Sequence, residues 1–223
     1  MKNLTLVIPA KREKESLPDV LEELKKYEFK ILVVLEENDI ETIEAIKKFD
    51  CEILYQKNKG YGDALIHGIN NVQTELFCIF NADGSFNPKE LSVMQDKIYK
   101  DNFDFVFASR YEKNCSSEDD TWVTFVGNFI FSKIGNIFFN LKITDILYTY
   151  VIGKTILAQQ LNLTRKDFVF CVELPIKAKR QNLKITTSKS NERARIGGKK
   201  KVNAIKDGFL ILIAMIKLFF RSN

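Results

Sequence analysis

Asn81 and Asp83 are the residues whose types and spacing best suit chemistry. They follow an apolar run, residues 76–80, that predicts a buried strand, and they precede residues 87–90, which predict a turn that opens a helix. At the carboxyl end of a strand in an open α/β sheet, both side-chain oxygens would face the crevice where ligands bind. Hard divalent cations prefer such oxygen ligands and neutralise phosphate. The pair predicts a cation and phosphate site, with an Asx turn after a strand as the structural alternative.

Charged residues also follow the predicted first and fifth strands. Pro9 ends the first strand, and Glu13 and Glu15 follow it in a loop rich in Lys and Arg. That loop would face the ligand crevice, where a carboxylate accepts hydrogen bonds from a ribose or a base, although a solvated surface loop fits the same residues. Arg110 follows the fifth strand, where an arginine either holds a phosphate or lies on the surface.

Two glycine-containing segments point to anion binding. Gly60 and Gly62 lie in residues 58–64, a turn that opens a predicted helix, and glycine lets a ligand approach the backbone at the helix N-terminus. No G-K-[ST] follows, so this turn is not a P-loop. Residues 192–201 surround two glycines with Arg193, Arg195, Lys199, Lys200 and Lys201. This basic loop suits phosphates or an anionic membrane surface, and nucleic acid is not expected because no aromatic residues are interleaved.

Composition narrows the class of protein. The 223 residues, 45% apolar and with a net charge of +5, suit one α/β domain. The four cysteines are scattered without a C-x-x-C pair, which predicts reduced thiols of a cytoplasmic protein. The only histidine, His67, falls in a predicted helix without a Ser or Cys partner, so a Ser-His-Asp or Cys-His hydrolase is not expected. The N-terminus leads directly into a strand, with no signal peptide expected.

The elements that must position these residues alternate between strand and helix. Apolar runs predict strands at residues 4–8, 30–35, 52–55, 76–80 and 103–108, and helical stripes predict helices at residues 17–24, 40–49, 64–72 and 91–99. Repeated βα units with short connections predict a mainly parallel, doubly wound sheet. A helix at 122–139, a helix at 168–180 with Pro175 in its first turn, and a strand at 183–187 follow.

The C-terminal segment is apolar on all sides over residues 209–216. Such a helix is not half-exposed on a globular surface, so it would lie in a membrane interface, bury in a partner or pack on its own domain. No uninterrupted apolar run of about 18 residues exists, so no membrane-spanning helix is expected.

Seven segments occur in an order typical of one enzyme family: VIPAKREKESLP, KGYGDAL, NADGSFNPKEL, FASRY, TDILYTYVIGK, VELPIKAKRQNLKI and RIGGKKKVN. Together they resemble the family 2 glycosyltransferases of the GT-A fold, and most of all the dolichyl-phosphate mannose synthase and polyprenyl-phosphate glycosyltransferase group. The third segment is similar to the D-A-D-x-S motif. The fifth matches the T-D motif at Asp145, the sixth contains Glu173 at the start of a helix, and the last matches R-x-x-G-x-S-K at Arg195, Gly198 and Lys201.

The chain departs from this pattern at four places. Asn81 replaces the first aspartate of D-x-D, and Leu35-Glu36 replaces the usual Asp-Asp after the second strand. Arg12 and Lys200 replace an asparagine and a serine. A neutral Asn81 removes one negative charge from the metal site, so cation affinity should fall, and Glu36 would contact the base in place of an aspartate.

The resemblance implies a GT-A domain over residues 1–201, with a mainly parallel sheet flanked by helices, and a membrane-associated C-terminal helix over residues 202–223. It implies catalytic roles for Asp83, Arg110 and Asp145. It implies donor contacts at Pro9, Glu13, Glu36, Gly60, Asn81, Asp83, Arg195 and Lys201, with Asp83 and Asn81 holding Mg²⁺ or Mn²⁺.

The implied reaction moves a sugar, with inversion, from a nucleoside diphosphate sugar to an acceptor. A polyprenyl phosphate acceptor is favoured by the basic loop, by the apolar C-terminus and by the lack of an E-D pair typical of polysaccharide-forming members. A phosphate monoester carries its own charge and needs no general base. The protein would then lie at the cytoplasmic face of a membrane.

Two alternatives stay open. A sugar nucleotidyltransferase shares the VIPAKRE start but needs a glycine-rich loop after it, and residues 11–17 contain no glycine. The other is a catalytically weakened descendant of the fold that binds nucleotide or membrane, for which Asn81 and Leu35 are the strongest arguments.

Overall fold

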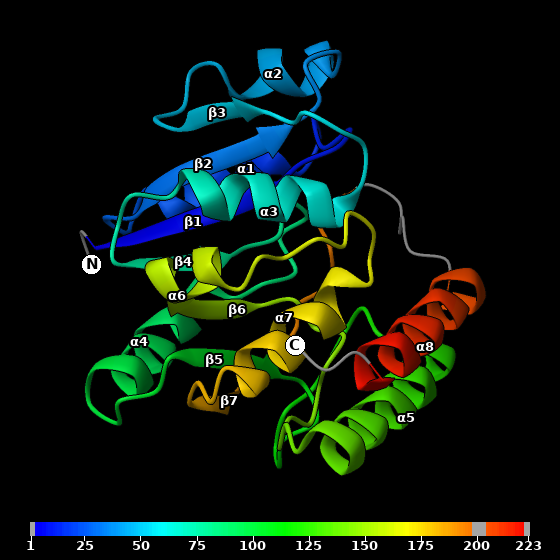
Figure 1. Ribbon diagram of the computed structural model, residues 1–223. Coiled ribbons are helices and arrows are strands. Elements are labelled where there is room, and N and C mark those ends of the chain that lie inside the picture. The colour runs from blue at the N-terminus through cyan, green and yellow to red at the C-terminus, as the bar shows by residue number, and fades with distance from the viewer. Residues whose placement is uncertain (1–2, 198–203, 221–223) are drawn as a thin grey trace.

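One mixed sheet forms the centre of the molecule, with helices on both of its faces (Figure 1). The structure is a computed structural model and describes residues 3–197 and 204–220. Its first half contains β1 (Leu4–Pro9), α1 (Leu17–Leu24), β2 (Lys30–Leu35), α2 (Ile40–Ile46), β3 (Glu52–Tyr55), α3 (Tyr61–Asn71), β4 (Leu76–Ile79), η1 (Pro88–Glu90), α4 (Leu91–Tyr99) and β5 (Phe105–Ser109). Its second half contains α5 (Trp122–Phe139), β6 (Val151–Lys154), α6 (Thr155–Gln160), α7 (Phe170–Arg180), β7 (Ile185–Lys189) and α8 (Ala204–Phe220).

Within the described residues the sheet has seven strands in the order β3-β2-β1-β4-β6-β5-β7. All neighbouring strands pair in parallel except β6, which runs antiparallel to β4 and to β5. Pro9 lies opposite Val34, and Val7 lies opposite Ile79, so β1, β2 and β4 end at the same edge of the sheet. Open α/β sheets bind ligands at this edge. The predicted mainly parallel α/β fold is confirmed.

Two apolar layers hold the helices against the sheet. Val7 belongs to the layer under α3, α6, α7 and α8, whereas Leu6 and Ile8 belong to the layer under α1, α2 and α4. This division follows from the strand, because successive side chains point to opposite faces. The helices complement it with apolar stripes, such as the one over Leu17–Leu24 that buries Leu17 and Leu21.

The second half of the chain departs from the sequence-based expectation. β6 and α6 were not predicted, because four residues with Gly153 among them are too short an apolar pattern to indicate a strand. The prediction that Pro175 lies in the first turn of its helix is wrong: α7 begins at Phe170, which places Pro175 in the second turn. The packing of residues 170–176, which are all buried, offsets the cost of the lost backbone hydrogen bond.

α5 and α8 lie side by side at the edge of the molecule toward which β2 points (Figure 1). Among the described residues, α5 is the one helix long and apolar enough to cross a membrane, by length and composition only, and 17% of it is buried. The expectation of no membrane-spanning helix stays a prediction, because length and composition alone do not show that α5 crosses a membrane. It relied on uninterrupted apolar residues, whereas α5 contains polar ones such as Asn128 and Ser132.

An aromatic cluster supports the loop that follows β4. The Phe86 side chain is 1% exposed, and its ring lies 4.5 Å from that of Tyr150, 4.9 Å from that of Tyr148 and 5.8 Å from that of Phe80, between centroids. The Tyr150 hydroxyl donates a 2.8 Å hydrogen bond to the Asn87 carbonyl. Residues 80–87 therefore rest on a rigid apolar base.

Truncating this base should destabilise the whole domain. We expect Phe86→Ala to lower the free energy of unfolding by about 3–5 kcal/mol, because it opens a cavity in a packed cluster. Urea denaturation measures this change. Trp122→Ala is the matched control: that side chain is 78% exposed, and its loss should change the free energy by less than about 0.5 kcal/mol. Equal effects of both substitutions would contradict the role of the cluster.

Candidate functional site

Asp83 lies at the carboxyl edge of the sheet in a tight turn, as its position after β4 predicted. Its Oδ1 accepts hydrogen bonds from the backbone N–H of Ser85 at 3.0 Å and from the Ser85 hydroxyl at 2.7 Å. Gly84 has a φ of +81°, a left-handed conformation that favours glycine. The Asn81 amide donates a 3.3 Å bond to the same Ser85 hydroxyl. The Asx turn and the grouping of Asn81 with Asp83 are thus both present.

A loop from far along the chain covers this turn. The backbone N–H of Ile196 donates to the Asp83 carbonyl at 2.8 Å, and the N–H of Arg193 donates to the Ser85 carbonyl at 2.9 Å. The Ile196 side chain packs over Gly84 so closely that a Cβ there would lie 2.5 Å from it. The described part of the basic segment therefore sits directly on the Asp83 turn.

Arg195 in that loop joins two carboxylates. Its Nη2 lies 3.4 Å from Asp83 Oδ2 and 3.1 Å from Asp119 Oδ2. Burial lowers the pKa of the Arg195 guanidinium, but Asp119 and Asp83 raise it further, so the net pKa is above its ordinary value. Arg195 is thus a fixed positive charge beside Asp83, in agreement with its predicted place in the site.

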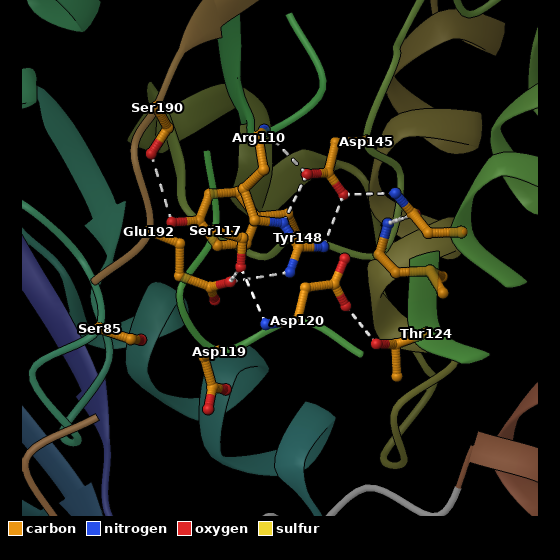
Figure 2. Close-up of polar contacts among 12 residues, drawn as sticks. Ser85, Arg110, Ser117, Asp119, Asp120, Thr124, Asp145, Tyr148, Ser190 and Glu192 are labelled. Carbon is orange, nitrogen blue, oxygen red and sulfur yellow. Dashed lines mark hydrogen bonds and ion pairs between the residues drawn. The ribbon is translucent and has the colours of Figure 1, made fainter. Parts of the chain in front are cut away.

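A second arginine, Arg110, lies in a largely buried polar cluster (Figure 2). Arg110 Nε donates to Asp145 Oδ2 at 2.8 Å, Nη2 donates to Asp145 Oδ1 at 3.0 Å, and Nη1 donates to Glu192 Oε2 at 3.0 Å. The guanidinium also stacks 4.5 Å from the Tyr148 ring centre. Burial lowers the pKa of Arg110, but Asp145 and Glu192 raise it well above its ordinary value.

Asp145 acts through Arg110 in this arrangement. The residue is 0% exposed, and its carboxylate also accepts the Arg110 backbone N–H at 3.0 Å and the Asn128 amide at 2.6 Å. Its oxygens are directed at these donors and not at the crevice. The predicted catalytic pair Arg110 and Asp145 is therefore brought together, with Asp145 as the residue that orients Arg110.

Glu192 and Asn128 were not assigned a role from the sequence. Glu192 stands directly before the basic residues of its segment. It pairs with Arg110, which is 82 residues away in the sequence, so a local pattern could not indicate this contact. Burial raises the pKa of the Glu192 carboxyl, while Arg110 and the Ser117 hydroxyl oppose that rise. Nothing in the local pattern around Asn128 marks it, because it lies within an apolar helix.

Pro9 ends β1, the strand that pairs with β4, and Glu13 lies in the loop that follows it. Glu13 is 6% exposed and accepts a 2.7 Å hydrogen bond from the Ser16 hydroxyl. Its charge also raises the pKa of Arg195. Glu13 is therefore a buried carboxylate near Arg195 and is not a solvated loop residue.

Beyond β1, the ends of β2 and β3 frame an open hollow of about 450 Å³. Glu36, which pairs with Lys11 at 2.8 Å, is one of its lining residues. The full lining consists of Glu36, Glu37, Asn38, Gln56, Lys57, Asn58 and Lys59. The predicted donor-contact residue Glu36 therefore faces a space large enough for part of a ligand.

Glycine is required at positions 60 and 62 for a different reason from the one expected. A Cβ on Gly60 would lie 2.1 Å from the Lys166 carbonyl oxygen, and one on Gly62 would lie 2.1 Å from the Arg165 carbonyl oxygen. The close approach that requires glycine is made by the protein's own backbone, and the Lys166 carbonyl also accepts the Asp63 N–H. A ligand contact at Gly60 stays a prediction, and Lys201 lies outside the described residues.

The oxygen donors near Asp83 are few. Residues 3–197 and 204–220 contain no group of three or more His, Cys, Asp or Glu side chains that could hold a metal ion. Asp83 and Asn81 offer one carboxylate and one carboxamide oxygen. Mg²⁺ is commonly held by one or two carboxylates together with substrate phosphates, so this pair fits a cation shared with a diphosphate.

Comparison with known proteins gives a consistent result. The family model described as glycosyl transferase family 2 matches residues 5–162. An uncharacterized glycosyltransferase of Mycobacterium bovis is 25% identical over 210 residues, which cover 94% of each chain. An uncharacterized protein of Methanocaldococcus jannaschii is 25% identical over 190 residues, which cover 81% of this chain and 77% of the other.

Solved structures share the fold. Glucosyl-3-phosphoglycerate synthase from Mycobacterium tuberculosis, in complex with Mn²⁺, UDP and glucosyl-3-phosphoglycerate, matches with a TM-score of 0.73 and 11% identity, covering 100% of this chain and 81% of that one. Mannosyl-3-phosphoglycerate synthase from Rubrobacter xylanophilus matches with a TM-score of 0.70 and 13% identity, covering 97% and 73%.

Arg195 should compete with a cation for Asp83. We expect Arg195→Ala to tighten Mn²⁺ binding to the free protein by about fivefold or more, because a positive charge beside the carboxylate is removed. Isothermal titration without nucleotide measures this affinity. Arg193→Ala is the control, since Arg193 pairs with Glu23 at 2.9 Å and not with Asp83. Unchanged Mn²⁺ affinity in Arg195→Ala would contradict the competition.

Proposed function

The chain belongs to glycosyl transferase family 2 and is a glycosyltransferase, and we propose that it transfers a sugar, with inversion, from a nucleoside diphosphate sugar to a polyprenyl phosphate. The observation that carries the donor proposal is Asp83 at the carboxyl edge, between Asn81 and the guanidinium of Arg195. The hollow beside Glu36 offers space for the nucleoside on the same edge. A sugar nucleotidyltransferase is set aside because the family match covers the segments that suggested it.

Asp83 and Asn81 would hold the divalent cation through their oxygens, together with the donor diphosphate. Mg²⁺ or Mn²⁺ bound there supplies Lewis-acid stabilisation of the leaving nucleoside diphosphate. The complex of the glucosyl-3-phosphoglycerate synthase with Mn²⁺ and UDP supports this assignment by analogy. Arg195 would then exchange Asp83 for a phosphate oxygen, which keeps its charge compensated.

The charges of the crevice favour an acceptor that needs no general base. Asp83 and Asp119 are paired with Arg195, and Asp145 is paired with Arg110. A carboxylate in an ion pair is a poor proton acceptor, whereas a phosphate monoester is already ionised near neutral pH. In the proposed step an acceptor phosphate oxygen bonds to the anomeric carbon while the bond to the diphosphate oxygen breaks.

An apolar surface on α5 and α8 supports the lipid part of the proposal. We call it the α5–α8 surface and define it by side chains that are each at least 49% exposed: Trp122, Val123, Phe129, Ile130, Ile137 and Phe138 on α5, and Ile205, Phe209, Ile216, Phe219 and Phe220 on α8. Exposed apolar patches of this kind mark protein or membrane contacts. Amphipathic helices with aromatic apolar faces bind in the bilayer interface.

The charge around this surface suits anionic lipid. α5 carries Lys133 and no acidic residue, while α8 carries Lys206, Lys217 and one acid, Asp207. In the sequence, three lysines precede α8 and an arginine follows it. Basic residues beside an apolar face attract anionic headgroups, so we propose a peripheral location at the cytoplasmic face of a membrane.

α5 is proposed to lie on the bilayer and not to cross it. Its other face carries Asn128, Ser132 and Asn136, which are hydrogen-bonded to residues 143–147 at 2.6–3.1 Å. Crossing the bilayer would remove these groups from their partners, which is costly in hydrocarbon.

The acceptor can be identified by a transfer assay. We expect the purified protein with Mn²⁺ to move label from one of a panel of nucleotide sugars, including UDP-glucose and GDP-mannose, to a polyprenyl phosphate, with the product extracted into organic solvent. Asp83→Ala should lower kcat by about a hundredfold or more, because the leaving diphosphate loses its cation. Phosphoglyceric acid serves as the competing acceptor in parallel reactions, because the fold is shared with phosphoglycerate-using enzymes.

Transfer to phosphoglyceric acid alone would overturn the lipid acceptor. No transfer by the wild type from any donor, with turnover gained in Asn81→Asp, would instead identify a catalytically weakened descendant.

Membrane binding can be measured separately by co-sedimentation with vesicles of phosphatidylcholine and phosphatidylglycerol. The double variant Phe129→Glu, Phe209→Glu should bind at least about tenfold more weakly, because charges replace apolar side chains in the α5–α8 surface. Val93→Glu is the matched control, since Val93 is 55% exposed on α4. Equal binding by all three proteins would contradict a membrane role for this surface.

A further inference from the structure

Glu173 of α7 is a buried carboxylate that the proposed chemistry does not use. The residue is 1% exposed. Its Oε2 accepts the backbone N–H of Arg165 at 2.8 Å and that of Thr164 at 2.9 Å, and its Oε1 accepts the Thr164 hydroxyl at 2.9 Å. Lys177 Nζ lies 2.9 Å from Oε1. Every polar contact of this carboxylate is with a donor.

These donors belong to the loop between α6 and α7. Burial alone would raise the pKa of Glu173, but Lys177 and the N–H groups of Arg165 and Thr164 hold it below its ordinary value. The carboxylate is therefore ionised near neutral pH. It fixes the backbone of residues 164 and 165, and so determines where the next carbonyl groups point.

Those carbonyl groups pack against the glycine turn at residues 60–62. The Lys166 carbonyl accepts the Asp63 N–H at 3.0 Å, in the first turn of α3. The carbonyl oxygens of Arg165 and Lys166 occupy the space where side chains on Gly62 and Gly60 would lie. The loop held by Glu173 thus sets the position of the N-terminus of α3.

The N-terminus of α3 in turn holds one wall of the hollow at the ends of β2 and β3. The Asp63 carboxylate accepts the Asn58 backbone N–H at 3.1 Å and the Asn58 amide at 3.0 Å. The Gln56 amide donates to the Gly60 carbonyl at 2.7 Å. Gln56 and Asn58 both line the hollow.

We propose that Glu173 is a positioning residue for the nucleoside diphosphate pocket: through the loop at 164–167 and the glycine turn at 60–62, it fixes the wall formed by residues 56–59. The inference rests on the proposed function only in taking that hollow as the donor pocket. Glu173 itself does not line the hollow. Its effect is on donor binding and not on the transfer step.

Asp104 offers a matched comparison within the same protein. It also accepts a backbone N–H, that of Lys184 at 2.8 Å, and it also pairs with a lysine, Lys154, at 2.7 Å. It precedes β5 and therefore lies at the opposite edge of the sheet from the hollow. Asp104→Asn and Glu173→Gln remove the same kind of interaction, but only the second is connected to the wall.

The test combines nucleotide binding with amide hydrogen exchange. In Glu173→Gln, we expect UDP or GDP with Mn²⁺, whichever the wild type binds, to bind at least about tenfold more weakly. The donor KM should rise by a similar factor, with kcat changed less than about threefold. Residues 56–63 should exchange faster in the free variant. Asp104→Asn should leave all of these values unchanged, even where both variants have a lower Tm.

Unchanged binding and unchanged exchange over residues 56–63 in Glu173→Gln would overturn the inference. If Glu173→Gln does not fold, Thr164→Val removes only the hydroxyl contact, and it should weaken nucleotide binding and speed the same exchange to a smaller degree. No change in Thr164→Val would then overturn it. A wild type that binds neither nucleotide refutes the donor proposal, whereas the exchange measurement still decides whether Glu173 holds the wall.

Discussion

The ion pair between Arg110 and Asp145 is the contact on which the arrangement of the site depends. It joins the end of β5 to the segment before β6, and through Glu192 and Asn128 it reaches the segment after β7 and the middle of α5. Breaking such a buried pair leaves an uncompensated charge, at a cost of about 3–5 kcal/mol. The pair therefore holds four segments in one geometry, and the chemistry of the crevice is built around it.

Paired charge is the common property of the crevice. Each of two arginines pairs with two carboxylates there, so every one of these groups has a partner of opposite sign, and the four carboxylates outnumber the two guanidinium groups. In the proposed donor complex, the cation would take the place of Arg195 at Asp83, and the phosphates would take the place of Asp83 at Arg195. Each group would exchange one partner of opposite charge for another, which lowers the reorganisation that binding requires.

α5 connects this network to the surface of the molecule. Polar side chains at every fourth position, Asn128, Ser132 and Asn136, lie on one face of the helix and hold residues 143–147, while large apolar side chains lie exposed elsewhere on it. The spacing follows from the helical repeat of 3.6 residues per turn. One helix therefore carries both the support for Arg110 and part of the proposed membrane contact.

The sequence by itself determined the alternation of strands and helices, the extent of α5 and the position of Asp83 after a buried strand, because these follow from local apolar periods and from where a strand ends. The grouping of Asp83, Asn81 and Arg195 was also predictable, but only through the order of motifs along the chain. The tertiary structure alone decided that β6 runs antiparallel and that the backbone of residues 165–166 packs against Gly60 and Gly62. It alone also placed Glu192 beside Arg110 and Asn128 beside Asp145. These features arise from contacts between segments far apart in the chain, and a local pattern of residue types contains no information about which distant partner a strand, a glycine or a carboxylate will meet.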